Sequence, residues 1–473
     1  MIASNLTDPD LTDADKESVP QMVTTENGNT TTVLGQAAFS SNYIASTFVS
    51  QGEPQWMLNR RSDAFEQFRT TPMPSTELEA WRRTDIRGLS IDNFHPPTPD
   101  TLDSTLVQQI PHDSDQQVGL LVQQNGVILN SVNSNRGVYF ADLQTALKEK
   151  PGLVETYLGQ AIQQSQTYSR NRFEVMHNAF MKGGYVLYLP AGAVVEDPFQ
   201  VFITLNGDAV ADFSHTLIIA EANSQATIFE EFRSTADKDP ALHCGAVEIF
   251  LSPNAHLNFV QIQGWNQKTW HFSTQRAIVE RDANLRWVTT CLGSRLTKID
   301  QLVELTGTGA NADMLGLALA DKRQHIDVHT YQKHAAPHTT SDLLYRNVLT
   351  DRSRTVWRGM IEVVQDAQNI DAYQKNDNLL LSKHARADTI PGLEILADEV
   401  RCTHGATAGQ IDPEQIYYLM SRGLPQHWAE EVIVSGFLEP VLQRIPSNDL
   451  RNRLEQSISH KLEKDATPVS AKQ

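Results

Sequence analysis

Cysteine is scarce in this sequence of 473 residues, because it occurs only at positions 244, 291 and 402. Cysteines so far apart cannot form a CxxC metal clamp or the disulfide framework of a small secreted domain. Long apolar runs are missing too, since no stretch approaches the roughly 20 consecutive apolar residues of a membrane span. The N-terminus, MIASNLTDPDLTDADKES, is acidic, whereas an export signal would be basic and then apolar. We therefore expect a cytoplasmic protein.

Positive charge is in deficit as well. The 39 Lys and Arg residues face 57 Asp and Glu residues, which gives a formal net charge of -18. Such a surface repels nucleic acid and anionic membranes, so we expect neither as a partner. The motifs of several common catalytic sites do not occur either: GxxxxGK(S/T), GxGxxG after a strand, HExxH and GxSxG.

The chain divides into regions of different pattern. Residues 1–41 are rich in Thr, Asn, Asp, Ser and Gln and poor in large apolar side chains, so we expect a disordered tail. Residues 42–184 are predicted to be mostly helical, with a linker over 92–115 and a hairpin at Asn125-Gly126. Residues 411–473 are again predicted to be helical, because Asp412 is suited to cap a first helix and Gly423 to end it.

Between residues 185 and 410 the apolar side chains recur with a period of two, in segments such as YVLYLP, HTLIIAE, AVEIFLS and LRWVTT. Turn-forming stretches separate these segments at irregular intervals of about 15 to 45 residues, and long helical patterns are missing. So long a run of strands suits a parallel β-helix, which grows by adding coils, or a very large sandwich or barrel. The pattern alone leaves both architectures open.

The most promising chemical cluster is Cys402 and His404 in the stretch RCTHGATAGQID. A thiolate and an imidazole are ligands that suit iron or zinc. At positions i and i+2 of a strand the two side chains face the same side, so they can share one ion or point together at a partner. The structural alternative is an ordinary buried cysteine beside a hydrogen-bonded histidine.

A second cluster lies in KRQHIDVHTYQKHAAPH, where Asp327 accompanies four histidines: His325, His329, His334 and His338. On a strand the first two histidines and the aspartate share one face, which can present metal ligands or a proton-sensitive patch. Polar residues lining one face of a coil are the favoured interpretation. Three tryptophans are expected in the core or in a surface ridge rather than around a cofactor: Trp265, Trp270 and Trp287.

The stretches LLYRNVLTDRSRTVWRGMIEV and RCTHGATAGQIDPEQIYYLMSRGL resemble the SufB/SufD family of iron-sulfur cluster assembly scaffolds. The N-terminal stretches GEPQWMLNRRSDAFEQF and WRRTDI, together with WRGMIEV and the final SRGL, look like the SufD side of that family. The resemblance runs from about Asn42 to about Ile445.

This resemblance implies a mainly β protein whose right-handed parallel β-helix core, residues 185–410, lies between helical N- and C-terminal regions. It implies pairing with a SufB-like paralogue through the β-helices, and a homodimer is the alternative when that partner is absent. In the family, the histidine of the CxHGAT motif helps to hold iron or a nascent iron-sulfur cluster at the interface. By position these residues are His404 and Cys402 here.

The short helices after Asp412 carry apolar faces that need a covering surface, either the body of this protein or another subunit. The resemblance implies that they bind a SufC-like ATPase, to which ATP hydrolysis would belong, while this chain is a scaffold without catalysis of its own. The expected contact residues are Ile416, Tyr417, Met420 and Arg422.

One departure from the SufB pattern bears on this assignment. SufB proteins carry a cluster-associated cysteine in the stretch that corresponds to LLLSKHARADTIP, and this chain has none between Ser382 and Pro391. The difference favours SufD over SufB. It also leaves too few thiolates for a usual four-ligand iron-sulfur site, so any cluster must take ligands from the partner.

Two functions from other classes stay open as alternatives. A polysaccharide-active enzyme on a β-helix would need paired carboxylates in an exposed groove, and the adjacent Glu230 and Glu231 are expected to point to opposite faces of a strand. A stand-alone metal-binding protein would use the histidines between positions 325 and 338.

Overall fold

The structure, a computed structural model, describes residues 38–97, 102–103, 105, 107, 118–134, 137–164, 171–445 and 447–465. Residues 1–37 of the expected tail and much of the expected linker over 92–115 lie outside the described residues. Phe39 packs against Phe180 with ring centroids 5.3 Å apart, and Ser40 accepts a hydrogen bond from the backbone N–H of Tyr43. Packed structure therefore begins ahead of residue 42, where the sequence predicts the helical region to start.

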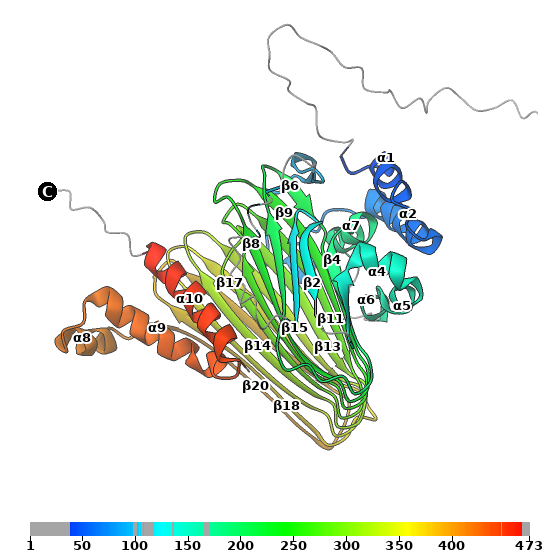
Figure 1. Cartoon of the computed structure of the whole chain (residues 1–473). Coiled ribbons are helices and arrows are strands. Elements are labelled where there is room, and N and C mark those ends of the chain that lie inside the picture. Colours follow the sequence, from blue (N-terminus) through cyan, green and yellow to red (C-terminus); the bar gives the residue numbers. More distant parts are fainter. Residues whose placement is uncertain are drawn as a thin grey trace, which may run out of the picture. The chain divides into compact units, whose positions relative to one another are not determined.

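Two long sheets of mainly parallel strands form the centre of the protein (Figure 1). The chain passes from one sheet to the other and back, so each coil adds one strand to each sheet, and about 8 coils are stacked. The first sheet contains, in spatial order, β2 (Val127–Asn133), β1 (Gly119–Gln124), β5 (Phe199–Leu205), β8 (Gln225–Ser234), β10 (His256–Gly264), β12 (Asn284–Cys291), β14 (Asn311–Ala320), β16 (Thr340–Leu349), β18 (Ile370–Leu380) and β20 (Val400–Gln410). The second contains β3 (Tyr139–Asp142), β4 (Gly184–Leu189), β7 (His215–Ala220), β9 (Ala241–Leu251), β11 (Trp270–Val279), β13 (Leu296–Leu305), β15 (His325–His334), β17 (Arg354–Val363) and β19 (Arg386–Ile395), with β6 (Val210–Asp212) beside β9.

One turn of each coil holds a residue in the left-handed backbone conformation. Asn223 and Asn254 occupy this position in successive coils with φ of 60° and 59°, and Asn254 Nδ2 donates a hydrogen bond to Asn223 Oδ1 at 3.3 Å. Asparagine, aspartate and glycine tolerate this conformation best. The later coils place these residues there: Asp282, Gly309, His338 and Asn369. The turns thus recur about every 30 residues, a more regular spacing than the sequence interpretation gives.

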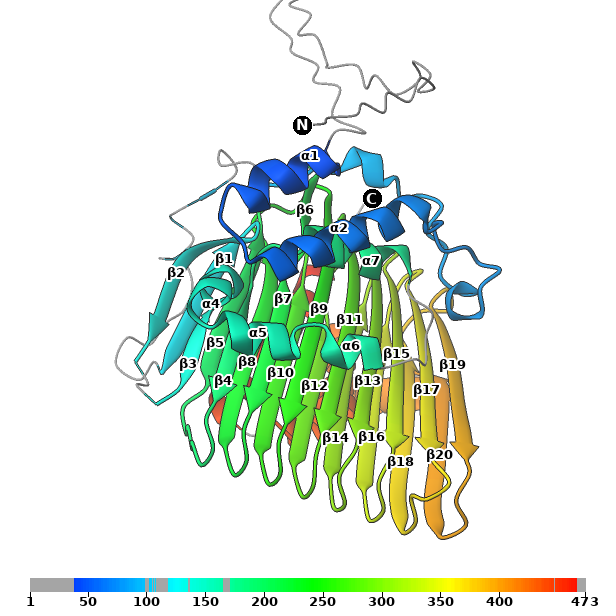
Figure 2. The ribbon, with the colours of Figure 1, turned by 90° about the vertical axis from the view of Figure 1, so that its right-hand side faces the viewer.

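Helices from the N-terminal part of the chain lie on the outer face of the second sheet (Figure 2). Phe173 stacks on Phe272 of β11 with ring centroids 3.6 Å apart, and Trp81 packs against both rings. Arg61 is fully buried, where its guanidinium pairs with Glu53 at 2.7 Å. The helices and helical turns are α1 (Ser41–Ile44), η1 (Ala45–Val49), α2 (Gln55–Thr70), η2 (Glu79–Trp81), η3 (Ile91–Asn93), α4 (Leu143–Glu149), α5 (Pro151–Tyr157), α6 (Gln160–Gln164) and α7 (Arg172–Phe180).

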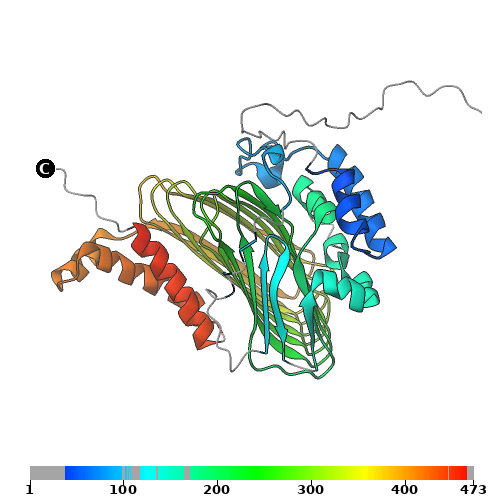
Figure 3. The same cartoon turned by 45° about the horizontal axis from the view of Figure 1, so that its top comes forward.

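Three C-terminal helices follow the last strand: α8 (Pro413–Ser421), α9 (Gln426–Leu442) and α10 (Asn448–Asp465). The second half of α9 and one side of α10 bury Val434, Leu438 and Leu454 against the outer face of the first sheet. Figure 3 shows these helices and the N-terminal helices on opposite sides of the strands. The predicted cap and stop are confirmed, because Asp412 accepts a hydrogen bond from the backbone N–H of Glu414 and Gly423 has φ of 94°.

The predicted fold class is confirmed: the protein is mainly β, with a parallel β-helix between helical parts. The predicted hairpin is also present, since β1 and β2 are antiparallel around Asn125 and Gly126, both with positive φ. Among the helices of the described residues, none has the length and apolar character needed to cross a membrane.

The space between the two sheets, called the lumen below, contains a chain of hydrogen-bonded polar side chains within an apolar core. Glu230 accepts hydrogen bonds from Thr216 and Gln261, each at 2.7 Å, and burial raises the pKa of its carboxyl group. Gln261 in turn accepts from Gln275 at 2.9 Å, and Gln275 accepts from Gln301 at 3.1 Å. Each buried polar group is retained because its neighbour in the next coil provides a partner.

We predict that replacing Gln275 with Leu destabilises the fold by about 2 kcal/mol, because Gln261 and Gln301 each lose a hydrogen-bond partner in a dry environment. Chemical denaturation of the wild-type and variant chains measures the difference. The same substitution at the exposed Gln365 serves as the control and should leave stability within about 0.5 kcal/mol of wild type. If the Gln275→Leu and Gln365→Leu variants were equally stable, the hydrogen-bonded side chains of the lumen would not stabilise the fold as proposed.

The lumen also holds His334, whose ring nitrogens face Thr339 Oγ1 at 2.7 Å and Ser341 Oγ at 2.9 Å. Burial lowers the pKa of His334 from 6.5 to about 4. Between these two pH values the unfolded chain binds a proton that the folded chain does not, so the contribution of His334 to stability is present above pH 6.5 and is lost as the pH falls toward 4.

We therefore predict that His334 makes the free energy of unfolding of wild type fall by about 3 kcal/mol between pH 6.5 and pH 4. A His334→Gln variant should lack this part of the fall. Denaturant titrations at several pH values measure this difference. The control is a His384→Gln variant, which is changed at an exposed histidine. Its free energy of unfolding should depend on pH as that of wild type does. If the free energy of unfolding depends on pH in the same way in wild type, His334→Gln and His384→Gln, then His334 does not titrate in this way.

Candidate functional site

The last coil of the β-helix ends without a covering strand. β19 pairs with β17 and β20 pairs with β18, and neither pairs with a further strand within the described residues. Figure 2 shows both strands at the edge of the stack. No residue of β20 is fully buried, whereas most residues of the inner strands are. The backbone edge of this coil and its lumen are therefore open, and this region is called the open end below.

Cys402 and His404 lie on β20 and face the lumen at the open end. In the register between β18 and β20 they stand opposite Ala372 and Gln374, which are 1% and 0% exposed. Cys402 is half-buried beside the apolar residues of this last layer, and His404 is exposed. The prediction that the two side chains share one face is confirmed by this register. Burial, followed by the nearby Asp371, raises the pKa of the Cys402 thiol.

The lumen beneath His404 is polar. Gln374 Nε2 donates to the carbonyl of Gly392 at 3.0 Å, and Asn378 Nδ2 donates to Asn376 Oδ1 at 2.8 Å. Gln374 Oε1, Asn376 Nδ2 and Thr389 Oγ1 are buried without a hydrogen-bond partner among the described residues. These groups can bind a polar or ionic species that enters through the open end. Sequence reasoning missed them, although a coil repeat of about 30 residues would have placed Gln374 next to His404.

The rim of the open end combines charge with apolar surface. Arg354 pairs with Asp388 at 2.6 Å, and Arg386 pairs with the same carboxylate at 2.8 Å. Leu393 and Leu396 are exposed on the same coil. Such a mixture is typical of a surface that another protein covers.

Cys402 and His404 offer at most two ligands to one ion. Within the described part of the chain, no three His, Cys, Asp or Glu side chains are close enough together to hold a metal ion. β19, which includes most of the stretch between Ser382 and Pro391, adds no cysteine. A four-coordinate site at the open end would therefore need ligands from outside this chain.

The four histidines between positions 325 and 338 do not converge. His325 and His329 lie with Asp327 on the outer face of β15, as their spacing predicts, while His334 faces the lumen and His338 lies in an exposed turn with φ of 60°. The structure thus corrects the alternative of a metal site built from all four histidines, because the strand and the turn point their side chains in different directions.

The outer-face residues of β15 instead form a buried ionic network. Lys298 Nζ lies 2.9 Å from Asp327 and 2.7 Å from His329 Nε2. Thr84, from the stretch WRRTDI, contacts Asp327 and lies 2.9 Å from His325 Nε2. This network fastens the N-terminal region to the second sheet, and sequence reasoning missed the contributions of Lys298 and Thr84 because they come from distant segments.

The remaining candidate residues are three tryptophans and a pair of adjacent glutamates. Trp265, Trp270 and Trp287 are all at most 5% exposed, so the expectation that they belong to the core is confirmed. Glu230 faces the lumen, and Glu231 faces outward beside Arg233. The two carboxylates therefore point to opposite faces, as expected, which does not suit a glycosidase pair.

The apolar residues of the C-terminal helices divide into two groups. Val434, Leu438 and Leu454 are covered by the first sheet, whereas α8 has no buried residue. Tyr417 is 75% exposed and Trp428, at the start of α9, is 50% exposed. The other expected contact residues lie on α8 or just after it: Ile416 is half-buried, and Met420 and Arg422 are exposed.

Comparison with known protein families matches most of the described body to one family. Residues 39–201 match the family model "SufBD protein N-terminal region", and residues 202–437 match "SUF system FeS cluster assembly, SufBD core domain".

Curated relatives agree with this assignment. The iron-sulfur cluster assembly SufBD family protein of Staphylococcus saprophyticus is 27% identical over 424 residues, which cover 87% of this chain and 90% of that protein. The iron-sulfur cluster assembly protein SufB of Bacillus subtilis is 28% identical over 413 residues, covering 83% of this chain and 87% of that protein. The chain belongs to the SufBD family of iron-sulfur cluster assembly proteins.

Proposed function

We propose that this chain is the SufD-like scaffold subunit of an iron-sulfur cluster assembly complex and that it presents Cys402 and His404 to a nascent cluster or its iron. The observation that carries this proposal is the position of the two side chains, which face the lumen on the last, uncovered strand of the β-helix. The iron or cluster is cargo that passes through the complex, and this chain does not catalyse a reaction by itself.

The open end is the surface on which we expect a SufB-like paralogue to dock. The free backbone edges of β19 and β20 can accept further strands, and uncovered strand edges of this length are rare in proteins that act alone. Exposed Leu393 and Leu396 add apolar area that a partner would bury. A second copy of this chain presents the same edges, so a homodimer is the assembly expected when the paralogue is absent.

The ligands on this side of the interface favour the SufD position. Cys402 and His404 would provide only two ligands. The stretch between Ser382 and Pro391 lacks the cysteine that the SufB pattern has there. Because iron-sulfur clusters are usually held by about four ligands, the others would come from the paralogue. The raised pKa of Cys402 is consistent with a thiol that loses its proton only when a metal cation binds.

We expect a SufC-like ATPase to dock on α8 and the first turns of α9. These helices expose Tyr417, Met420 and Trp428, while the rest of α9 is committed to the first sheet. Uncovered aromatic and methionine side chains are common anchors in protein interfaces. ATP hydrolysis would take place in that partner, and the complex is expected in the cytoplasm.

The cargo site is tested by replacing His404 with Ala and co-expressing the chain with its SufB-like and ATPase partners. The proposed docking surface also includes the edges of β19 and β20 with Leu393 and Leu396, so the complex should still assemble without the His404 side chain, while the iron that it retains should fall well below the wild-type amount. Iron and acid-labile sulfide per purified complex are the measurements. The matched control is His256→Ala, another exposed histidine on a strand of the first sheet. Undiminished iron in the His404 variant would remove this residue from the proposal.

The docking surface is tested by a double substitution, Tyr417→Asp with Met420→Asp. Both side chains are exposed in this chain, so the fold should be kept, while affinity for the ATPase should drop at least ~10-fold because anchors are lost and charge is placed in the interface. Calorimetry or surface plasmon resonance gives the affinity. Leu78→Asp changes an apolar side chain that is 52% exposed in the N-terminal region and should bind like wild type. ATPase binding that is equal in both variants would refute the assigned surface.

A further inference from the structure

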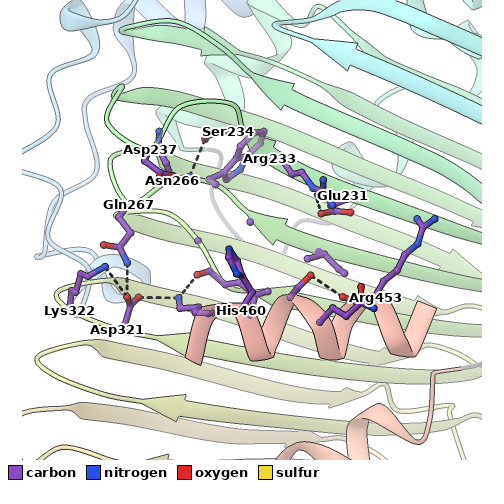
Figure 4. A pocket seen from close by; sticks show the side chains of 18 residues that line it. Glu231, Arg233, Ser234, Asp237, Asn266, Gln267, Asp321, Lys322, Arg453 and His460 are labelled. Atoms are coloured by element: carbon purple, nitrogen blue, oxygen red, sulfur yellow. Dashed lines mark hydrogen bonds and ion pairs between the residues drawn. The ribbon is translucent and has the colours of Figure 1, made fainter. Parts of the chain in front are cut away.

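A deep groove separates α10 from the loops that follow four strands of the first sheet (Figure 4). Its volume is about 740 Å³, a size typical of sites for small organic ligands. The floor consists of outward-facing residues at the ends of β8 and β10, among them Glu231, Arg233 and Ile262. One wall is α10, with Arg453 and His460, and the other wall is made by the loops after β8, β10, β12 and β14.

The groove opens beside Arg233 because its neighbour on the next strand has no side chain. In the register between β8 and β10, Arg233 stands opposite Gly264, and both line the groove. Any larger residue at position 264 would occupy the space next to the guanidinium on the same face of the sheet. The Arg233 side chain, which is 43% exposed, therefore has room beside it for another molecule.

The groove is cationic in a strongly acidic protein. Two arginines, two lysines and one histidine line it against three carboxylates, while the whole chain has a formal charge of -18. Arg233 pairs with Glu231, and Lys461 and Lys322 lie 3.0 Å and 3.4 Å from Asp321. A local reversal of the overall charge marks a place where an anion is attracted.

Arg453 is a half-buried member of this set of cations. It projects from α10, where its guanidinium donates a hydrogen bond to the neutral Gln200 Oε1 at 3.0 Å. Partial burial is the main cause that lowers the pKa of Arg453; Arg233 acts in the same direction, while Glu231 and Asp449 oppose the shift. Arg233 and Arg453 both line the groove, and the planar guanidinium binds phosphate and carboxylate through paired hydrogen bonds.

We propose that this groove binds a small molecule that carries phosphate or carboxylate groups, with Arg233, Arg453 and His460 as its anion-binding side chains. The ligand would bridge α10 and the loops of the first sheet, and so would hold the C-terminal helix on the β-helix. This site lies outside the open end and outside the surface of α8, and it does not depend on the function proposed for either.

The test is calorimetric titration of the full-length chain at low salt with four probes: inorganic phosphate, pyrophosphate, ADP and citrate. At least one probe should bind with one-to-one stoichiometry and should bind less tightly as salt is added. Binding of pyrophosphate or ADP without citrate would identify phosphate as the recognised group, and the reverse would identify carboxylate. Absence of binding by all four probes would overturn the proposal.

Variants tie the binding to the groove. Arg453→Gln and His460→Glu should each weaken the bound probe at least ~10-fold. Because Arg453 also contacts Gln200, its replacement can disturb the packing of α10, whereas His460 is exposed and its replacement leaves that packing intact. The control is Arg69→Gln on α2, where Arg69 forms an exposed ion pair with Glu66. The assignment of the groove as the binding site would be refuted if the His460→Glu chain bound the probe with wild-type affinity. It would also be refuted if the Arg69→Gln chain lost as much affinity as the groove variants.

Discussion

Backbone hydrogen bonding between stacked coils is the constraint on which the rest of this structure depends. Each inner strand has a paired neighbour on both sides, parallel in all coils after β1 and β4, so its amide groups are satisfied, and the residues it sends into the lumen are sealed by the next coil. The same rule fails at β19 and β20, where stacking stops. Both the free strand edges and the access to Cys402 and His404 are consequences of ending the stack without a cap. A cap made of this chain's own residues would have closed the site as well as the edge.

Polar side chains in the lumen depend on hydrogen bonds within and between coils. Near the middle, Gln261, Gln275 and Gln301 satisfy one another through contacts between adjacent coils. Buried atoms without a partner in the described residues occur in the middle of the stack, as at Trp287 Nε1, and near the open end, as at Gln374 Oε1 and Thr389 Oγ1. An unpaired buried polar atom costs about 1–3 kcal/mol, and near the open end the proposed partner or cargo would offset this cost for Gln374 and Thr389.

The sequence predicts the parts of this structure that depend on local pattern. Alternation predicts the strands and the shared face of Cys402 and His404, and cap residues such as Asp412 predict helix starts. The regular coil repeat is harder to see, because its turn position is held by Asn254, Asp282 or His338, which share a positive φ rather than a residue type. Contacts that need the register between coils, such as Gln374 beneath His404, could not be read from local pattern. Nor could the separation of the C-terminal apolar residues into a covered and an uncovered group.

That separation determines how the C-terminal helices could act on the site. α8 projects without burying a side chain, while α9 is fixed to the first sheet by Arg444, which reaches Asp342 on β16 at 2.9 Å and also contacts Asp313 on β14. Arg346 on β16 donates to the carbonyl of Phe437 on α9. β18 separates β16 from β20. An ATPase that docks on α8 as proposed would thus be linked through α9 to β16, which lies two strands away from the strand of His404.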